Sequence, residues 1–575
     1  MSNSKTPQFD AKLDEILNTL VPHSRVCGAC ATEFTLEIGD VEHLKMLRVP
    51  PPTLCPSCRN RRRLSYANYS NIYKRKCDAP GHDHIMIAII PPIMPWVAYD
   101  YEAYYGDAWD PFSYGISASA SEPFFGEFYK VLKNIPHSGI RRGADSPNSD
   151  FSFYGKHMKD CYYVFGGRRS EDIMFGSSIY DSKHAVDAYF LRNVEISYEN
   201  ISTSECYKCF YAYFSSNSID CEFIYDCRNC QNCFGCTNLR NKNYCWFNEQ
   251  LSKSEYEKRR ASVYLGDRVE NKKQKELFWN FVRENPIRAV RVFQSVNVSG
   301  NDIKESNNCY DVFQTENSDN VRHAYFAIMN MKDSMDVNYG GHAERLYETQ
   351  NVATSANVKF SFGVKESNNC EFMMATTNCS NCFGCVGINY ASYCIFNTHY
   401  EPDVYWQKLD EIKTAMLERG EYGEYFPIGF GPCAYNSSLA NIIYPMTESE
   451  VKNIGGYWQP DMEVDTSSIQ TLSINELPEN INDVPDSICS SAIIGELSGK
   501  PFRLVPREVA FYKRYHIALP TDTPHQRMLD RYKILNNFRV GHDVCFSCGK
   551  DILSAHRTTD GYKPYCASCY QRDFL

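Results

Sequence analysis

The sequence NCFGCTNLRNKNYCWFN, from Asn232 to Asn248, returns in closely similar form as NCFGCVGINYASYCIFN, from Asn381 to Asn397. Each stretch closes a longer run in which a small or apolar residue, followed by aromatic residues, recurs every 12 positions. The first run has its recurring positions at Cys161, Ile173, Ala185, Ser197, Cys209, Cys221, Cys233 and Cys245. The second has them at Val358, Cys370, Cys382 and Cys394, and it slips by a residue or two back to Val321 and Cys309. We therefore predict two homologous halves, an internal duplication.

Short β-type runs at a fixed spacing, punctuated by Asn, Ser and Gly, are typical of a repeat architecture. We interpret each 12-residue unit as one strand and one turn of a parallel β-solenoid, and the spacing leaves open whether a rung holds one unit or two. The recurring Cys, Val, Ala and Ile side chains are expected to stack inside, and Asn side chains in the turns to form amide ladders. Charged helical stretches at Ser252–Arg288 and Pro402–Arg419 are expected to cap and link the solenoids.

Cysteine pairs with CxxC spacing lie near both ends of the chain. Two such pairs on a short connecting segment can supply four thiolates at tetrahedral reach, which is what a structural Zn²⁺ ion requires. Unrelated free thiols are the alternative. We predict two structural Zn²⁺ sites, and their ligands are Cys27, Cys30, Cys55, Cys58, Cys545, Cys548, Cys566 and Cys569.

The two ends of the chain also align with each other, as tandems of two zinc ribbons. FTLEIGDVEHLKMLRVPPP from Phe34 aligns without a gap with FRLVPREVAFYKRYHIALP from Phe502. In this register the ligands of the first ribbon fall on Gly495, Ser498, Thr523 and Gln526. Further along, Cys77 falls on Cys545, Cys548 falls on Pro80, and Cys566 and Cys569 fall near Asp100 and Ala103. We therefore expect the N-terminal tandem to keep its first metal site and the C-terminal tandem its second.

Two histidines follow Cys77 in the sequence CDAPGHDH. His82 and His84 suggest the remnant of a Cys/His metal site. The alignment, however, places all three residues in a ribbon that has lost its partners, and we expect no metal there.

Bulk composition limits the classes of protein to consider. At 575 residues the chain should hold several domains, and a net charge of −10 confines any nucleic-acid surface to a local patch. The start MSNSKTPQFDAKLDEIL has no apolar signal-peptide core, and the uncharged run Ile85–Tyr99 is shorter than a membrane span and contains prolines. We expect a cytoplasmic protein with no membrane partner, whose 26 cysteines bind metal or pack. An aromatic content of 14%, with 41 tyrosines, favours a β-rich body.

A basic, tyrosine-rich segment without acidic residues, RNRRRLSYANYSNIYKRK, begins directly after the ligand Cys58. Guanidinium groups can bind phosphates through charge and hydrogen bonds, and tyrosine rings can stack on exposed bases. We therefore predict binding of nucleic acid, structured RNA or the ribosome, by Arg59, Arg61, Arg62, Arg63, Tyr66, Tyr69, Tyr73, Lys74, Arg75 and Lys76. The alternatives are a solvated helix face, arginines that pack over the ribbon and the first rung of the solenoid, and an acidic protein partner.

Catalytic motifs are sparse. The chain has no Gly-rich phosphate loop, nucleophile elbow or HExxH, and His342 is a lone histidine. A carbohydrate-active β-helix enzyme is a further alternative, but the acidic residues are scattered, without a cluster that repeats on one face. The run Cys227, Cys230, Cys233 and Cys236 has iron–sulfur spacing, but the second half has Thr376 in place of Cys227. We interpret these cysteines as stacked core residues and the protein as non-enzymatic.

The segments LCPSCRNRRRL, YKRKC, WDPFSYG, NCFGC, FPIGFGPCAYN and DVPDSI together resemble a zinc-ribbon, Cys-rich repeat family of Candidate Phyla Radiation (Patescibacteria) bacteria. The resemblance spans nearly the whole chain. It implies a bacterial, cytosolic protein with Cys-rich repeats and implies no activity. Members often carry Cys pairs where this chain has Gly495, Ser498, Thr523 and Gln526.

The fold class expected is mainly β, with two tandem parallel β-solenoid segments, capping helices and zinc ribbons at both ends. The N-terminal ribbon tandem is placed at 1–110, the first solenoid at 111–250 and a capping helix at 251–292. The second solenoid follows at 293–400, a helix and irregular cap at 401–458, a linker at 459–490 and the C-terminal ribbon tandem at 491–575.

Overall fold

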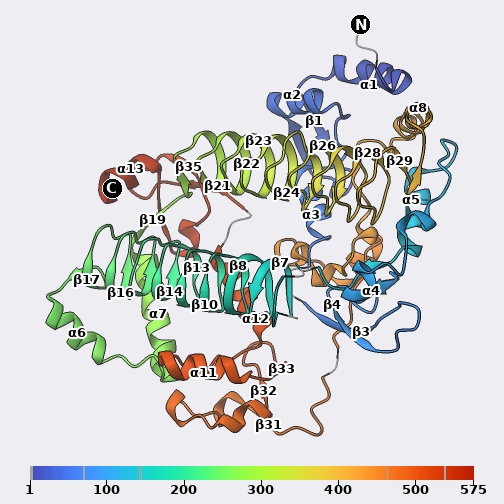
Figure 1. Ribbon diagram of the computed structural model, residues 1–575. Helices are drawn as coiled ribbons and strands as arrows, with labels where there is room; N and C mark the ends of the chain where they lie inside the picture. The colour runs from blue at the N-terminus through green and yellow to red at the C-terminus, as the bar shows by residue number, and fades with distance from the viewer. Residues whose placement is uncertain are drawn as a thin grey trace. The chain divides into compact units, whose positions relative to one another are not determined.

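The computed structural model describes residues 4–68, 71–141, 143, 145–149, 151–462, 464–535 and 539–575. The chain forms two compact units that interleave along the sequence. One unit comprises Met1–Ile140 and Arg291–Gln459, and the other comprises Arg141–Val290 and Pro460–Leu575 (Figure 1). Each unit therefore joins one end of the chain to the 12-residue repeat that lies farther from that end in sequence. Residues 111–140, which the sequence grouped with the first repeat, belong with the N-terminal segment.

The first repeat array, Ser152–Gln250, consists almost wholly of parallel strands. Its strands are β7 (Ser152–Lys159), β8 (Val164–Met174), β9 (Ser177–Tyr180), β10 (Lys183–Val186), β11 (Tyr189–Arg192), β12 (Glu195–Tyr198), β13 (Ile201–Ser204), β14 (Tyr207–Tyr213), β15 (Glu222–Tyr225), β16 (Gln231–Thr237), β17 (Asn243–Trp246) and β18 (Glu249–Gln250). Ile173 pairs with Ala185, and Ala185 pairs with Ser197. The pairings close into a ring through β8, β10, β12, β14, β13, β11 and β9, because the long strands β8 and β14 each pair with two series of shorter strands.

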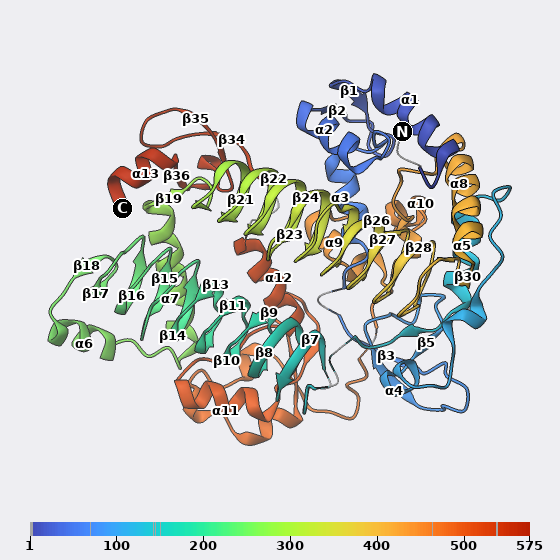
Figure 2. The ribbon, with the colours of Figure 1, turned by 45° about the horizontal axis from the view of Figure 1, so that its top comes forward.

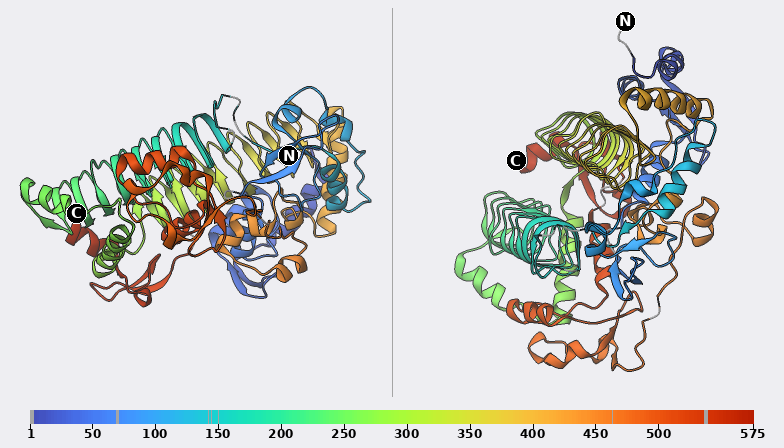
Figure 3. Two further views of the ribbon diagram at one scale, coloured as in Figure 1. Left: turned by 90° about the horizontal axis from the view of Figure 1, so that it is seen from below. Right: turned by 45° about the vertical axis from the view of Figure 1, so that its right-hand side comes forward.

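The second repeat array, Val292–His399, is built in the same way in the other unit. Its strands are β20 (Val292–Phe293), β21 (Val296–Lys304), β22 (Asn307–Glu316), β23 (Asp319–Ala327), β24 (Lys332–Gly340), β25 (Tyr347–Gln350), β26 (Ala356–Phe362), β27 (Asn368–Glu371), β28 (Ser380–Phe383), β29 (Cys394–Ile395) and β30 (Thr398–His399). Val358 pairs with Cys370, and Cys370 pairs with Cys382. The register changes where Val321 pairs with Ser334, which accounts for the slip in the sequence period. Figure 3 shows the parallel strands of each array. The mainly β class is confirmed.

Both arrays have a shorter period that was not predicted from the sequence. Core side chains recur at every third residue, so each 12-residue repeat holds four triplets; four successive core positions are Cys227, Cys230, Cys233 and Cys236. The residue before each core position has positive φ, for example 52° at Asn229 and 51° at Asn232. Asn and Asp adopt this left-handed conformation more readily than other residues with a side chain. This explains why Asn so often precedes Cys in this sequence.

Asparagine ladders form on the array surfaces, as the sequence predicted. Asn357 Nδ2 donates a hydrogen bond to Asn369 Oδ1 at 3.1 Å, and Asn229 Nδ2 donates one to Asn241 Oδ1 at 2.6 Å. Each ladder joins equivalent positions of consecutive repeats. Side-chain hydrogen bonds therefore reinforce the backbone register.

Helices follow both arrays at the predicted places. α6 (Lys253–Ala261) and α7 (Arg268–Glu284) follow the first array, and α7 packs Phe278 against Tyr213 and Phe223. α8 (Pro402–Glu418) follows the second array and lies beside α1 (Pro7–Thr19), as Figure 2 shows. The carboxylate of Asp410 in α8 accepts hydrogen bonds from the backbone of Gln8 and Phe9 at 3.1 and 2.8 Å. It thereby pairs N–H groups that a helix start leaves unsatisfied.

Four small modules share one plan, in which an antiparallel hairpin is followed by a helix. Module 1 has β1 (His23–Val26), β2 (Glu33–Leu36) and α3 (Pro56–Leu64); module 2 has β3 (Tyr73–Lys76), β4 (Ile85–Ala88) and α4 (Tyr101–Tyr105); module 3 has β32 (Ala492–Ile494), β33 (Pro501–Phe502) and α12 (Pro524–Leu535); module 4 has β34 (Gly541–Val544), β35 (Asp551–Ser554) and α13 (Ala567–Phe574). Within modules 1 and 3, α2 (Ile38–Leu47) and α11 (Pro506–Tyr515) occupy aligned positions, and each ends in a left-handed residue with φ of 52°, Arg48 or His516.

Further elements complete the two units. The helices are α5 (Phe124–Asn134), α9 (Leu439–Ile443) and α10 (Glu448–Asn453), and the short strands are β5 (Ala98–Tyr99), β6 (His137–Ser138), β19 (Pro286–Arg288), β31 (Thr471–Leu472) and β36 (Lys563–Tyr565). In module 4, β36 pairs with β19, which directly follows α7.

Candidate metal centres

Module 1 brings four cysteines together at the end of a hairpin. Cys27 and Cys30 lie between β1 and β2, Cys55 caps α3, and Cys58 lies in the first turn of that helix. The four Sγ atoms lie within 4.8 Å of one another, and those of Cys30 and Cys55 are 3.8 Å apart. Pro56 occupies the first position of α3, where a missing N–H costs nothing. The sequence therefore starts a helix immediately after a candidate ligand.

Module 4 repeats this geometry with Cys545, Cys548, Cys566 and Cys569. The Sγ atoms of Cys548 and Cys566 are 3.9 Å apart, and Cys566 caps α13 as Cys55 caps α3. The predicted assembly of both cysteine tetrads is confirmed. Each is a four-thiol cluster able to hold a metal ion.

Hydrogen bonds favour the deprotonated thiols that metal binding needs. The backbone N–H of Cys55 donates to Cys27 Sγ at 3.3 Å, and that of Cys566 donates to Cys545 Sγ at 3.2 Å. A hydrogen bond from Cys58 lowers the pKa of Cys55 to about 5. One from Ser568 lowers the pKa of Cys566 to about 6. The hydrogen bond with Cys55 raises the pKa of its partner Cys58, and the pKa of Cys569 is raised as well. One thiol of each pair therefore ionises first, and the other loses its proton when a cation binds.

Module 3 replaces the ligands by a hydrogen-bonded carboxylate. It has Gly495, Ser498, Thr523 and Gln526 at the ligand positions. Asp522 Oδ2 accepts the backbone N–H groups of Leu497 and Ser498 at 2.6 and 3.1 Å. Oδ1 of the same residue accepts the N–H of Thr523 at 2.8 Å. A buried carboxylate thus joins the hairpin to the start of α12 without a metal.

Module 2 gathers a mixed set of possible ligands. Cys77, His82, His84 and Asp100 bring their ligand atoms within 4.8 Å of one another. The sequence suggested Cys77, His82 and His84 as the remnant of a metal site but gave them no partners. Asp100 was not predicted as a ligand, although the alignment of the two chain ends places it near Cys566.

The Arg59–Lys76 segment does not form the exposed surface that the sequence predicted. The side chains of Arg59 and Arg63 are 1% and 0% exposed, and Tyr66 and Tyr73 are also buried. Arg61, Arg62 and Arg75 are half-buried, and Lys74 and Lys76 are exposed. Tyr69 lies outside the described residues. The prediction that the whole segment contacts nucleic acid needs correction, because its two most buried arginines cannot reach a ligand.

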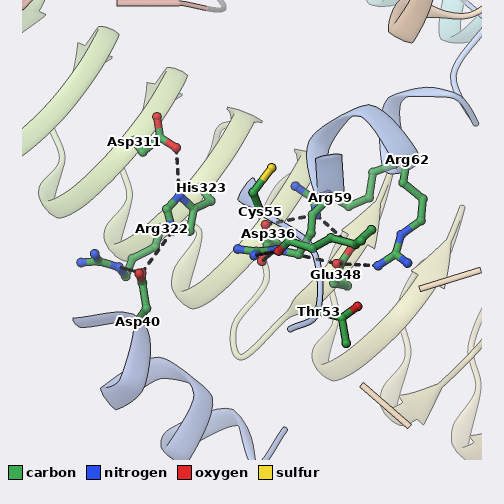
Figure 4. A network of polar contacts seen from close by, with 12 residues as sticks. Asp40, Thr53, Cys55, Arg59, Arg62, Asp311, Arg322, His323, Asp336 and Glu348 are labelled. Atoms are coloured by element: carbon green, nitrogen blue, oxygen red, sulfur yellow. Dashed lines mark hydrogen bonds and ion pairs between the residues drawn. The ribbon is translucent and has the colours of Figure 1, made fainter. Parts of the chain in front are cut away.

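Buried acidic residues of the second array hold these arginines (Figure 4). Arg59 Nε donates to Asp336 Oδ2 at 2.8 Å, and Arg63 Nη1 donates to Glu348 Oε2 at 2.9 Å. Arg62 bridges Glu348 at 3.0 Å and Glu424 at 2.8 Å. Burial opposes the charge of Arg59, but Asp336 keeps its pKa above the usual value. Of the alternatives, packing of the arginines over the ribbon and a neighbouring repeat is nearest to what the structure shows, although the repeat concerned belongs to the second array and not to the first.

The cysteine run Cys227–Cys236 is part of the array core. All four of its thiols are buried, and each donates to the carbonyl two residues earlier, as Cys230 Sγ does to Arg228 O at 3.5 Å. The groups that could hold a metal ion in the described part of the chain include none of these cysteines. We find no support for the iron–sulfur alternative.

Comparison with known proteins does not identify a family or an activity for this chain. No family model and no curated protein matches the chain. Among solved structures, a protein of Desulfovibrio desulfuricans G20, provisionally assigned as an acetyltransferase, matches 41% of this chain at 10% identity with a TM-score of 0.11. The match spans 66% of that protein, just under two thirds. A likeness at this level carries no argument about fold or activity.

In the part of the chain that the structure describes, no helix combines the length and apolar character needed to cross a bilayer.

Proposed function

We propose that this chain is a non-enzymatic scaffold held together by Zn²⁺ that binds single-stranded or structured RNA. Four cysteine thiolates at tetrahedral reach suit Zn²⁺ better than other divalent ions that prefer oxygen ligands. Cys27, Cys30, Cys55 and Cys58 would hold one ion, and Cys545, Cys548, Cys566 and Cys569 the other. With four protein ligands each, both ions would be structural.

Both arrays are proposed to be β-solenoids with one 12-residue repeat per rung. The pairing of residues twelve positions apart, with core residues at every third position, supports a coil of four short sides. A stack of such coils offers a rigid surface on which equivalent side chains repeat at the strand spacing, about 4.8 Å. A scaffold of this kind can present a long, regular binding surface.

A cationic ladder on the first array carries the RNA proposal. Lys156 pairs in register with Arg168, Arg168 with Tyr180, and Tyr180 with Arg192. Lys156 and Arg168 are exposed, and neither has an acidic ion-pair partner among the residues that the structure describes. Arg192 stacks on Phe190 with its guanidinium 5.0 Å from the ring centre. We call these four residues the cationic ladder.

The cationic ladder offers the chemistry that the sequence had assigned to the Arg59–Lys76 segment. Its cations can neutralise phosphates, and Tyr180 offers a ring face on which a base can stack. Nearby cations on the same array differ, since Lys159 and Lys183 both pair with Glu171, and Lys208 pairs with Asp220. A polyanion would therefore meet uncompensated charge at Lys156 and Arg168 and compensated charge beside them.

The test is binding of a fluorescent single-stranded RNA oligonucleotide to the zinc-loaded full chain across a salt series. The triple variant Lys156→Ala, Arg168→Ala, Arg192→Ala is expected to weaken binding. It should also reduce the slope of log affinity against log salt by about 2, because each phosphate contact on a single strand contributes about 0.7.

The matched control is Lys159→Ala, Lys183→Ala, Lys208→Ala, which removes the same charge from the same array. It should keep most of the affinity and the slope. If the wild-type chain does not bind RNA at low salt, or if both triple variants lose affinity equally, the proposal is wrong.

A further inference from the structure

Module 2 has the same backbone hydrogen bonds as the modules that carry four cysteines. In every module the residue after the first ligand position donates its N–H to the carbonyl two residues before the third ligand position. The pairs are Gly28 to Thr53 at 3.1 Å, Asp78 to Ala98 at 2.9 Å, Glu496 to Thr521 at 2.9 Å and Phe546 to Pro564 at 2.9 Å. Cys77 and Asp100 therefore stand where Cys545 and Cys566 stand in module 4.

A second shared bond concerns the first ligand itself. Asp100 N–H donates to Cys77 Sγ at 3.3 Å, as Cys55 N–H does to Cys27 Sγ and Cys566 N–H does to Cys545 Sγ. Asp100 also caps α4, because its Oδ1 accepts the N–H of Ala103 at 2.8 Å. This bond fixes the carboxylate and leaves Oδ2 directed at the cluster. A hydrogen bond that holds a ligand side chain in this way orients the side chain toward the metal ion.

The side chains of His82, His84 and Cys77 converge on Asp100 Oδ2. His82 Nδ1 lies 2.8 Å from it, His84 Nε2 lies 3.1 Å from it, and Cys77 Sγ lies 3.5 Å from it. Cys77 Sγ is also 3.7 Å from His82 Nδ1. With bonds of about 2.0 Å to nitrogen and oxygen and about 2.3 Å to sulfur, a tetrahedral zinc ion separates its ligand atoms by about 3.2–3.7 Å. The two separations that involve Cys77 Sγ, 3.5 and 3.7 Å, lie in that range. The two histidine nitrogens lie closer to Asp100 Oδ2, at 2.8 and 3.1 Å, which are hydrogen-bond distances, so metal binding requires them to move apart by a few tenths of an ångström.

The cluster combines one thiol, two imidazoles and one carboxylate, all of them zinc ligands. We propose that Cys77, His82, His84 and Asp100 bind a third metal ion, Zn²⁺. Module 2 would then be a ribbon whose ligands have changed in type but which still binds metal. Module 3 gives the contrast, because there the ligand types are gone and Asp522 joins the hairpin to the helix by hydrogen bonds alone.

The composition of the site predicts its behaviour. Four protein ligands leave no open position, so the ion would be structural. Cys77 is 1% exposed, but the side chains of His82 and His84 are 35% and 51% exposed. With one thiolate and two accessible imidazoles, the third ion is expected to leave to a chelator before the ions of the cysteine tetrads.

The first experiment counts metal in the purified full-length protein by mass spectrometry. We expect three zinc ions per chain in the wild-type protein and two in the double variant His82→Ala, His84→Ala. The matched control is His157→Ala, His184→Ala, because these exposed histidines also pair with aspartates, Asp145 and Asp172, but have no cysteine beside them. The control should retain three. Two ions in the wild type, or three in the His82/His84 variant, would overturn the proposal.

A second measurement does not depend on whether any variant folds. The metal-free wild-type chain is titrated with Co²⁺ and its visible absorption is followed. Sites with four thiolates give intense bands at long wavelength, and a site with one thiolate and three nitrogen or oxygen ligands gives weaker bands at shorter wavelength. A third equivalent with the second type of spectrum supports the site. Saturation after two equivalents with thiolate-rich bands refutes it, whatever the fate of the variant.

Discussion

Arg63 carries a positive charge in the interior of its unit. Its side chain is 0% exposed and lies between the carboxylates of Asp336 and Glu348. Replacing a whole buried ion pair by apolar groups can leave the stability unchanged, but removing only one partner leaves the remaining buried charges without compensation. We expect Arg63→Ala to lower the free energy of unfolding of its unit by about 3–5 kcal/mol. The measurement is the urea midpoint of the zinc-loaded chain.

Lys74→Ala is the control for this change. Lys74 belongs to the same basic segment but is exposed, and exposed substitutions shift the unfolding free energy by about 0.5 kcal/mol or less. Equal midpoints for the two variants would mean that Arg63 is not engaged as described. A midpoint of Arg63→Ala well below that of Lys74→Ala would confirm the buried network.

His323 gives the same unit a dependence on pH. Its ring lies 2.9 Å from Asp311 and 3.1 Å from Asp40 (Figure 4). Burial opposes protonation, but these carboxylates raise the pKa from 6.5 to about 9. A raised pKa means that the charged ring stabilises the fold fully below pH 6.5 and that this stabilisation is lost as the pH rises through about 9.

The expected loss across this window is on the order of 3 kcal/mol. Urea midpoints of the zinc-loaded chain should therefore fall between pH 6.5 and pH 9. His323→Gln should lower the midpoint at neutral pH and flatten the fall. A wild-type midpoint that stays constant across this window, or a fall that persists in the variant, would contradict the assignment.

Single residues were only partly predictable from the sequence. The cysteine tetrads were found because their spacing alone defines the chemistry. The acidic partners of the arginines were missed, although Asp336 and Glu348 lie one repeat apart and pair with the same helix. Along the sequence these acidic residues are scattered and form no cluster typical of a catalytic groove. Their role is to neutralise cations within the chain, and that role becomes visible only once the fold brings them to Arg59 and Arg63.

The repeat arrays are the elements that the sequence predicted best. Their 12-residue spacing reappears as the register of the parallel strands. The three-residue period within each repeat could not be seen in the sequence. The residues between core positions vary widely and include Tyr, Phe, Lys and Ser. Even the positions with positive φ hold such residues, for example Tyr211 and Phe223. Only the core positions are restricted to small and apolar side chains, so a period of three is visible only once the core is known.

Burial of the array cysteines predicts their reactivity. Desolvation raises the pKa of Cys161 and Cys309 to about 11, so little thiolate is present near neutral pH. Pulse alkylation with N-ethylmaleimide, read by peptide mass spectrometry, should leave the array cysteines unlabelled in the native chain. After chelation, the cysteines of modules 1 and 4 should label while those of the arrays remain protected.

Denaturant should expose all of these thiols to the reagent, which provides the positive control. The informative peptide is the one that contains Cys227–Cys236. Labelling of this peptide on chelation alone, together with modules 1 and 4, would mean that metal and not packing protects it. That outcome would restore the iron–sulfur alternative.

The assignment of chain segments to the two units is the feature that the sequence predicted least well. The linear order of segments suggested that each terminal ribbon would neighbour the adjacent repeat. Instead, each end of the chain joins the repeat that lies farther from it in sequence. Contacts between Arg59 and Asp336, or between Tyr570 and Asp226 at 2.9 Å, join residues that no local pattern relates. Such pairings come from burial and charge in three dimensions, which spacing along one sequence does not encode.

This interleaving predicts which array depends on which metal. In module 1, α3 places its arginines on Asp336 and Glu348 of the second array. In module 4, Tyr570 of α13 lies 2.7 Å from Asn238 of the first array. Because each helix begins at a cysteine ligand, losing the metal should loosen the strands that the helix contacts, while the stacked core of the array stays packed. Hydrogen exchange of Cys27→Ser should therefore show lost protection in the part of 291–459 around Asp336 and Glu348, far along the chain from the substitution.

Cys545→Ser is the reciprocal experiment, and it should lower protection in the part of 141–290 around Asp226 and Asn238 while 291–459 stays protected. Comparing the two variants distinguishes a loss of contact between one module and its array from a general loss of stability. Both variants remove one thiolate from equivalent clusters, so a general effect should be the same in each. Loss of protection in the sequence-adjacent array, or in both arrays to the same extent in both variants, would contradict the pairing of ends and repeats. The crossed pattern has no explanation in the linear order of segments, so observing it would establish that each metal module holds the distant array of its own unit.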